Sequence, residues 1–273
     1  MNGPSRDQQP DAWSAGAEGY ETAFAPFTVP YAQEALRLLG VGPGTRLLDV
    51  AAGSGVVTRH ALDLGAEVVA TDFAPGMVDL LARRLAEAGH ADVRVEVMDG
   101  QDLALADDSF DIAISMLGLI FFPDIDAGVR ELARVTRPGG QIAIGTWDLD
   151  HFRLVQLVQA AVARALPDFT LPAAEPTWAR IGHADGLIEL LVGHGLVDVV
   201  VHPVTQWWRF DDPVRFFHEL PSWSPPVQPL FDALGSEVLD RVAEAFVVEV
   251  DEASGPDGLR TDVLVAIGRP AAG

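Results

Sequence analysis

One short segment constrains the fold of this chain more than any other. In the segment 47–58 an apolar run ends in Asp49, and Gly53 and Gly55 follow just ahead of a helical pattern. Glycine allows the backbone to turn sharply between a strand and a helix, and its missing side chain lets a ligand approach the main chain closely. The segment therefore predicts a nucleotide-binding strand–turn–helix unit that carries an acidic side chain.

Strand-like and helical patterns alternate after this turn. The sequence Arg137-Pro138-Gly139-Gly140 predicts a tight turn, because proline presets one backbone angle and glycine accepts the positive φ that follows. The alternation predicts an α/β fold in which helices cover both faces of a parallel sheet. The expected strands are 46–50, 67–71, 93–98, 111–116 and 141–147, and the expected helices are 56–64, 75–88 and 125–135.

The two ends of the chain extend this core. Aromatic and apolar residues over Ala12–Leu39 predict a helical cap interrupted at Pro26 and Pro30, and the first ten residues or so are expected to be mobile. Residues Leu149–Ile181 predict an amphipathic helix and a loop rich in proline and alanine, which together form an inserted lid suited to substrate selection. The remainder predicts helices at 184–193, 213–218 and 229–245 and strands at 197–204 and 261–268, the two strands as an antiparallel pair at one edge.

Four regions follow from these patterns. They are a tail and cap (1–40), a cofactor-binding core (41–148), a helical lid (149–183), and a C-terminal part of the core with substrate-pocket elements (184–273).

Composition excludes several functions. The 18 basic and 40 acidic residues give a net charge of −22, which repels nucleic acids and anionic membranes. All the basic residues are arginine and the chain has no cysteine, so lysine Schiff bases, the lysine of the NTPase phosphate loop, thiolate nucleophiles and cysteine-ligated metals are absent. We predict no metal site. The N-terminus lacks a signal-peptide pattern and no apolar run is long enough to span a membrane, so the expected location is cytoplasmic, without membrane insertion.

Three aspartates, Asp49, Asp72 and Asp99, lie at the ends of the first three predicted strands. Asp72 is expected to bind both hydroxyls of a ribose, because its two oxygens match a vicinal diol. Phe73 and Met77 could cover an adenine, and Asp99, with Gly100 and Gln101, could bind the adenine edge. These residues define an adenosine site without fixing which cofactor binds.

Asp49 separates two kinds of adenosine cofactor. Its charge would repel the diphosphate of a nicotinamide cofactor, whereas it would stabilise the ammonium group of an amino-acid tail such as that of S-adenosylmethionine. A nicotinamide-dependent oxidoreductase therefore remains an alternative of lower rank.

The combined motifs resemble a known family. Leu47–Gly55, Asp72, Met98–Asp102, Ser109–Asp111 and Arg137–Gly140 are together similar to the class I S-adenosylmethionine-dependent methyltransferases, in particular the small-molecule branch that includes ubiquinone and menaquinone methyltransferases. The resemblance implies a Rossmann-like, seven-stranded, mostly parallel sheet with strand order 3-2-1-4-5-7-6, and S-adenosylhomocysteine as a product. Ala51 departs from the family pattern, which has glycine there, and so narrows the space beside the methionine tail.

The resemblance also implies roles for individual residues. The methionine moiety would lie against Asp49, Ala51, Gly53 and Gly55, the ribose on Asp72, the adenine beside Asp99 and Gln101, and the sulfonium above Ser115, Met116 and Leu117.

Aromatic residues in the cap and the second half predict a pocket for an apolar or ring-bearing substrate. The candidates are Tyr20, Phe121, Phe122, Trp147, Trp178 and Trp208. An oxygen acceptor would benefit from a general base, for which His151 and His218 are the candidates.

The sequence thus predicts methyl transfer to a small, rather apolar acceptor in the biosynthesis of a specialised metabolite or a quinone-like lipid. Positioning supplies most of the acceleration in such an in-line displacement. Two alternatives remain: an enzyme of this fold that catalyses another reaction, such as a cyclisation, and a non-catalytic cofactor-binding module. The expected partner is a small-molecule substrate, and a homodimer is compatible with the sequence.

Overall fold

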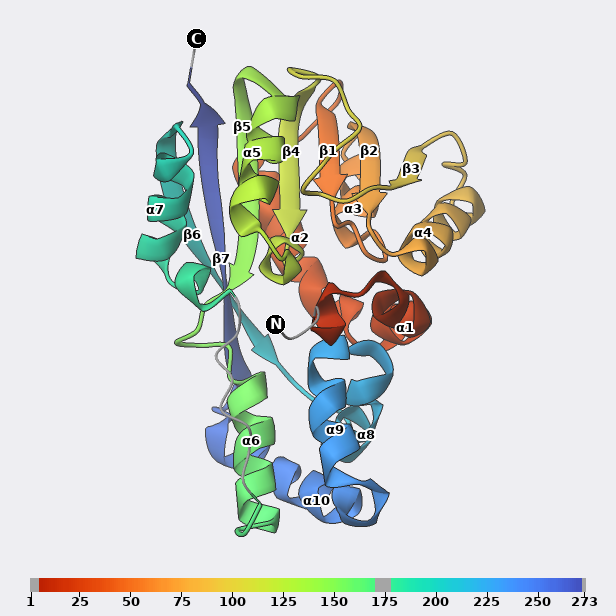
Figure 1. Cartoon of the computed structure of the whole chain (residues 1–273), viewed down its shortest axis with the longest axis vertical. Helices are drawn as coiled ribbons and strands as arrows, with labels where there is room; N and C mark the ends of the chain where they lie inside the picture. The colour runs from red at the N-terminus through yellow and green to blue at the C-terminus, as the bar shows by residue number, and fades with distance from the viewer. Residues whose placement is uncertain (1–4, 170–177, 272–273) are drawn as a thin grey trace.

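The computed structural model describes residues 5–169 and 178–271. It contains a seven-stranded sheet in the order β3-β2-β1-β4-β5-β7-β6 (Figure 1). The first five strands are parallel, and β7 is antiparallel to both β5 and β6. The predicted fold class and strand order are therefore confirmed. The strands are β1 Arg46–Val50, β2 Glu67–Asp72, β3 Arg94–Val97, β4 Phe110–Met116, β5 Thr136–Trp147, β6 Leu196–Trp208 and β7 Leu259–Pro270.

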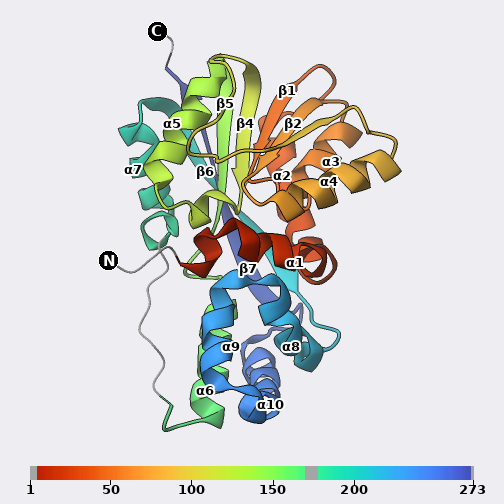
Figure 2. The ribbon, with the colours of Figure 1, turned by 45° about the vertical axis from the view of Figure 1, so that its right-hand side comes forward.

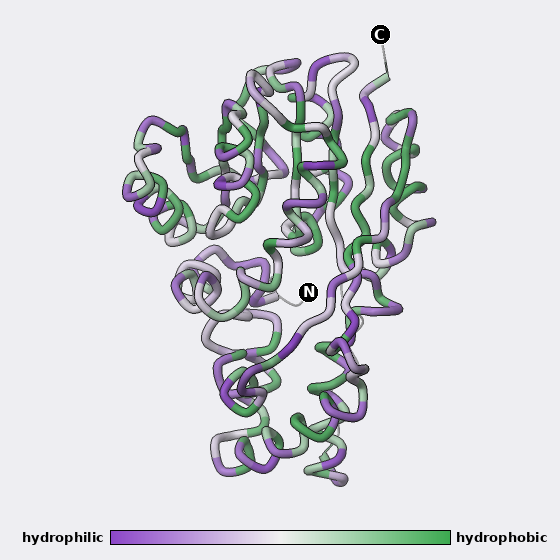
Figure 3. The backbone as a smooth tube through the Cα atoms, turned by 180° about the vertical axis from the view of Figure 1, so that it is seen from behind, coloured by the Kyte–Doolittle hydropathy of each residue, from purple (hydrophilic) through white to green (hydrophobic). Residues whose placement is uncertain are grey.

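Helices cover both faces of this sheet. Helices α2 (Ala25–Leu39) and α3 (Val56–Asp63) lie on one face, and α5 (Ile125–Val135) and α7 (Ala184–Gly193) lie on the other, while α4 (Pro75–Glu87) leads from β2 to β3 (Figure 1). The buried centre is formed by apolar residues of β1, β4 and β5, such as Leu48, Ile114 and Ile144. Hydrophobic residues accordingly concentrate in the central strands in Figure 3.

The predicted cap consists of two helices, α1 (Pro10–Ala23) and α2. The chain breaks at Phe24, just before Pro26, but the expected break at Pro30 was wrong because Pro30 lies inside α2. A proline in a first helical turn removes an N–H that has no partner there, which explains why Pro26 marks the break. At Pro30, burial of the following Tyr31, Ala35 and Leu36 offsets the lost hydrogen bond.

Helices α6 (Leu154–Ala165), α8 (Pro213–Trp223), α9 (Gln228–Leu234) and α10 (Ser236–Ala253) form a helical lobe below the sheet. Helix α1 lies between this lobe and the sheet (Figure 2). The predicted helix 229–245 is divided at Gly235, whose φ of +74° ends α9. The helix predicted over 213–218 continues through Pro221 to Trp223, and α6 supplies the expected helix of the lid; part of the loop that follows it, residues 170–177, lies outside the described residues.

The residues predicted to form a tight turn, 137–140, lie in an irregular part of a strand instead. Gly139 has the expected positive φ of +77°, yet β5 begins at Thr136, which pairs with Phe110 before the register shifts to the Ile112–Gln141 pair. Within 5–169 and 178–271, no helix has both the length and the apolar character needed to cross a bilayer.

Candidate functional site

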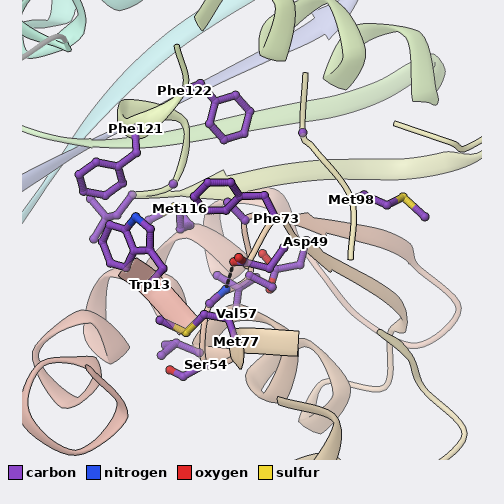
Figure 4. Close-up of a pocket in the computed structure, with 18 of the residues that line it drawn as sticks. Trp13, Asp49, Ser54, Val57, Phe73, Met77, Met98, Met116, Phe121 and Phe122 are labelled. Atoms are coloured by element: carbon purple, nitrogen blue, oxygen red, sulfur yellow. Dashed lines mark hydrogen bonds between the residues drawn. The ribbon is translucent and has the colours of Figure 1, made fainter. Parts of the chain in front are cut away.

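A pocket opens at the carboxyl ends of β1, β2 and β4, beside α1 (Figure 4). It encloses about 1000 Å³, counting its open mouth. Of the predicted site residues, the lining includes Tyr20, Asp49, Ala51, Gly53, Asp72, Phe73, Met77, Asp99, Gly100, Gln101, Met116, Leu117, Phe121 and Phe122.

Asp49 ends β1 deep inside the pocket and is only 1% exposed. Its Oδ2 accepts hydrogen bonds from the backbone N–H (3.1 Å) and the hydroxyl (2.7 Å) of Thr58 in the first turn of α3. Its Oδ1 accepts none from the described residues. The pKa of Asp49 is raised to about 7, mainly by burial and also by the charge of Asp72, while the Thr58 hydrogen bonds act to lower it.

Asp72 at the end of β2 is also buried, and it organises the surrounding backbone. Its Oδ2 accepts the N–H of Gly53 (2.8 Å) and its Oδ1 accepts the N–H of Ala74 (2.9 Å), so one carboxylate joins the β1–α3 turn to the start of α4. Burial raises its pKa to about 6, although these backbone hydrogen bonds favour the charged form. Asp49 and Asp72 together give the pocket a strong preference for a cation.

The third aspartate has a different environment. Asp99 is exposed, and its Oδ1 accepts both the backbone N–H and the side-chain amide of Gln101, each at 2.9 Å. The amide oxygen of Gln101 accepts the N–H of Asp124 at 2.8 Å. Both residues line the pocket, as predicted, but their polar groups are mostly paired with each other and with the loop.

The turn after β1 has unusual backbone conformations. Ala51 adopts a φ of +57° and Gly53 one of +55°, in the left-handed region that favours glycine. The Ser54 hydroxyl is buried and lacks a hydrogen-bond partner among the described residues. Gly55 was predicted to line the site, but it faces away, and a Cβ there would come within 2.1 Å of Leu81 Cδ1. Gly55 therefore permits close packing of α4.

Gly118 compensates for Ala51. A Cβ on Gly118 would lie 2.4 Å from the Cβ of Ala51, so the methyl group at position 51 requires glycine at position 118. We expect Gly118→Ala to lower the free energy of unfolding by about 1–3 kcal/mol through overpacking. Adding Ala51→Gly should recover most of that loss, since it removes one methyl group of the clash. Chemical denaturation of both single variants and the double variant measures this coupling, and strictly additive effects would contradict it.

Helix α1 is held over the pocket by ion pairs with α3 and α4. Glu21, whose side chain is 9% exposed, lies 3.2 Å from Arg59 and 3.0 Å from Arg84. The Ser14 hydroxyl accepts the N–H of Gly76 at 3.0 Å. These contacts fix the cap on α3 and α4, the helices that follow the Ala51 turn and Asp72.

The cap and the η2 segment (Leu119–Phe121) form an aromatic wall of the pocket. The ring centroids of Trp13 and Phe121 are 4.9 Å apart, and those of Trp13 and Tyr20 are 6.2 Å apart (Figure 4). Burial, and secondarily the charge of Asp72, raises the pKa of Tyr20 far above its usual value. Sequence reasoning missed Trp13, although its spacing of seven residues from Tyr20 places both on one face of α1.

Four other candidates lie outside the pocket lining. Ser115 is fully buried, and its hydroxyl accepts the N–H of Leu119 at 3.1 Å. Trp147 stacks on Phe152 with ring centroids 4.2 Å apart, and Trp208 packs on Phe27 at 4.9 Å. Trp178 is buried beside η3 (Ala179–Ile181). The predicted placement of the three tryptophans in the substrate pocket was therefore wrong, because they pack into the hydrophobic core.

The two histidines proposed as bases also lie elsewhere. His151 contacts Asp148 and Asp262 beyond the end of β5. His218 lies on α8, 3.3 Å from the exposed Asp240. Neither imidazole lines the pocket, so the structure offers no support for either as the base.

Comparisons with known proteins agree with this geometry. Residues 48–144 match a family model described as a methyltransferase domain. An uncharacterised protein of Mycobacterium tuberculosis is 36% identical over 165 residues, covering 59% of this chain and 60% of the relative. The demethylmenaquinone methyltransferase of Corynebacterium urealyticum is 44% identical over 108 residues, covering 40% of this chain and 44% of the relative. The chain thus spans about 60% or less of the length of these relatives.

Solved structures share the fold. The cyclase SpnF superposes with a TM-score of 0.60 at 17% identity, covering 98% of this chain and 97% of the other. The phosphoethanolamine N-methyltransferase 2 of Haemonchus contortus, in complex with S-adenosyl-L-methionine, superposes with a TM-score of 0.59 at 18% identity. The match covers 97% of this chain and 58% of the other.

The strand order and the pocket at the strand ends are those of the Rossmann-like methyltransferase fold, and residues 48–144 match a model of the methyltransferase domain. Over 108 residues the chain is similar to a demethylmenaquinone methyltransferase, as the sequence motifs implied.

Proposed function

We propose that this chain binds S-adenosylmethionine and transfers its methyl group to a small, largely apolar acceptor. The buried Asp49–Asp72 pair carries the proposal, because two carboxylates in one pocket favour a ligand that brings positive charge. An amino-acid tail and a sulfonium supply that charge, whereas a diphosphate would be repelled.

The residues present fit this cofactor. Asp49 is available for the ammonium group through Oδ1, and the orphaned Ser54 hydroxyl supplies a further polar group in the same pocket. The ribose would lie on Asp72 and the adenine between Phe73, Met77 and the Asp99 loop, all of which line the pocket. When bound, the cofactor supplies an electrophilic methyl group.

The aromatic wall supports an apolar acceptor. Trp13, Tyr20, Phe121 and Phe122 offer ring surfaces on the cap side of the pocket, where they exclude water from a bound acceptor. The Tyr20 hydroxyl stays protonated because its pKa is raised, so it can donate a hydrogen bond to an acceptor oxygen. These residues therefore orient the acceptor, and positioning supplies much of the acceleration. The acceptor class is compatible with the ring-bearing substrates that the relatives' name indicates.

Asp72→Ala tests the ribose assignment. We expect the affinity for S-adenosylmethionine to fall by roughly 1–3 kcal/mol, because charged hydrogen bonds to the sugar are lost. Isothermal titration calorimetry measures this, with circular dichroism to verify folding, since Asp72 also holds two backbone N–H groups. Asp63→Ala, outside the pocket lining, is the control. Wild-type affinity in a folded Asp72→Ala protein would refute the assignment.

Turnover tests the reaction itself. Incubating the protein with methyl-labelled S-adenosylmethionine and a demethylated quinol should yield labelled product and S-adenosylhomocysteine. Binding of the cofactor without S-adenosylhomocysteine, across a metabolite extract, would instead support a binding module or a non-methylating enzyme. Binding of a nicotinamide cofactor in its place would overturn the proposal.

A further inference from the structure

A second cluster of ionisable side chains lies away from the pocket, where the chain leaves the sheet. Asp148 follows β5 directly, His151 is three residues later, and Asp262 lies on the adjacent β7. The N–H of Asp148 donates to the carbonyl of Asp262 at 3.0 Å, which holds the two segments together. The cluster thus joins the sheet to the start of the helical lobe (Figures 1 and 2).

The three side chains point their ligand atoms at one another. His151 Nδ1 is 2.9 Å from Asp148 Oδ2 and 3.3 Å from Asp262 Oδ2, and the three atoms lie within 4.8 Å of one another. A tetrahedral zinc ion with bonds of about 2.0–2.1 Å keeps its ligand atoms about 3.3 Å apart. The two distances from His151 Nδ1 are close to that value, so a small shift of the side chains admits an ion.

Surrounding groups orient both carboxylates. Asp148 Oδ1 accepts the N–H of Asp150 at 3.0 Å, which leaves Oδ2 directed at the imidazole. Arg260 donates to both oxygens of Asp262, at 3.2 and 2.7 Å. Carboxylates held by such outer hydrogen bonds are typical of protein metal sites. The His151 side chain is 33% exposed and gives an ion access from solvent.

Arg260 is paired with Asp262, so the two carboxylates and the guanidinium leave one net negative charge beside His151, which favours a cation. The Asp262 side chain is 1% exposed and that of Asp148 is 12% exposed, so two carboxylates converge on a single ring nitrogen in a largely buried place. A proton on Nδ1 can be directed well at one of them, whereas a divalent ion interacts with both. Asp150 and His183 form a second such group that shares Asp148 and adds nearby ligands.

We propose that Asp148, His151 and Asp262 bind a divalent transition-metal ion, with zinc the best match to one imidazole and two carboxylates. The ion ties the β5–α6 junction to β7 and so stabilises the connection between the sheet and the helical lobe. It is separate from the methyl-transfer site, so the outcome of its test does not depend on the proposed activity.

Metal content and thermal stability test this site. The untagged full chain is stripped with EDTA, loaded with zinc, passed through a desalting column and analysed by mass spectrometry for elemental zinc. We expect stoichiometric zinc and a melting temperature several degrees above that of the stripped protein. His151→Ala and Asp148→Asn should lose both effects, whereas His218→Ala, whose imidazole faces the exposed Asp240 outside the cluster, should keep them.

Two results would overturn the proposal. One is wild-type protein that retains no zinc and melts at the same temperature with zinc or EDTA; in that case the cluster is a hydrogen-bonded link between β5 and β7. The other is zinc retention that His151→Ala leaves unchanged. If the variants do not fold, cobalt loading of the wild-type chain decides, because coordination by these side chains gives visible absorption bands that EDTA abolishes, and their absence refutes the site.

Discussion

Asparagine in place of Asp49 is expected to make the ligand-free protein more stable at pH 8 and to weaken its binding of S-adenosylmethionine. Burial raises the pKa of Asp49 from 3.8 to about 7. The folded state therefore holds this proton more tightly than the unfolded chain does. The stabilising effect is complete below the unfolded pKa and is lost as the pH rises through 7.

The size of the effect follows from the shift. A shift of about three pKa units corresponds to roughly 4 kcal/mol of folding stability that the wild-type protein loses at pH 8. Asparagine stays neutral and can still accept the two hydrogen bonds from Thr58, but its NH2 group replaces an acceptor oxygen. We therefore expect Asp49→Asn to raise the free energy of unfolding by about 2 kcal/mol at pH 8, around half of the roughly 4 kcal/mol that burial of the charge costs. At pH 4 we expect little change.

Chemical denaturation at both pH values measures the stability change, and calorimetry measures the expected loss of cofactor affinity. Asp99→Asn is the matched control, because Asp99 lines the same pocket but is exposed, and its stability should not change. A destabilised Asp49→Asn protein at pH 8, or one with unchanged cofactor affinity, would show that Asp49 does not hold its charge for a ligand.

Much of the fold could be predicted from the sequence, because the apolar runs and their turn residues are local. Helix α5 and helix α7 begin and end at the predicted residues, and β1 has its predicted bounds. The errors lie where tertiary packing overrides local preference. Pro30 stays inside α2 because its neighbours are buried, and β6 continues four residues beyond its predicted end, through Trp208, because β7 pairs with it along that length.

The sequence could likewise place some residues of the candidate site and not others. Residues at the strand ends, such as Asp49, Asp72 and Met116, could be placed because parallel strands bring their carboxyl ends to one edge. The aromatic residues could not be placed from the sequence, since a tryptophan suits a pocket and a hydrophobic core equally well. Trp13 joins the pocket because of how α1 packs, and Trp147 joins the core because Phe152 and Tyr31 of α2 pack on its ring; sequence spacing encodes neither.

The affinity for S-adenosylmethionine is expected to rise steeply between pH 5 and pH 7.5. Asp49 and Asp72, with pKa values of about 7 and about 6 in the ligand-free pocket, must both lose their protons to meet the cation and the ribose. The ammonium group of the ligand stays largely protonated over this range, since α-amino groups titrate near 7.7–8.0.

Two independent deprotonations would change the dissociation constant by up to about 800-fold between these pH values, with interaction between the two carboxylates spreading the change over a wider range. Calorimetry at half-unit steps measures it. In the Asp49→Asn protein the dissociation constant should still change about tenfold between these pH values, because only Asp72 then titrates. S-adenosylhomocysteine keeps the ammonium but lacks the sulfonium charge, so the same steep profile for both ligands places Asp49 against the amino-acid tail. A flat profile for both would mean that the carboxylates are already ionised, and the electrostatic basis for choosing this cofactor would fail.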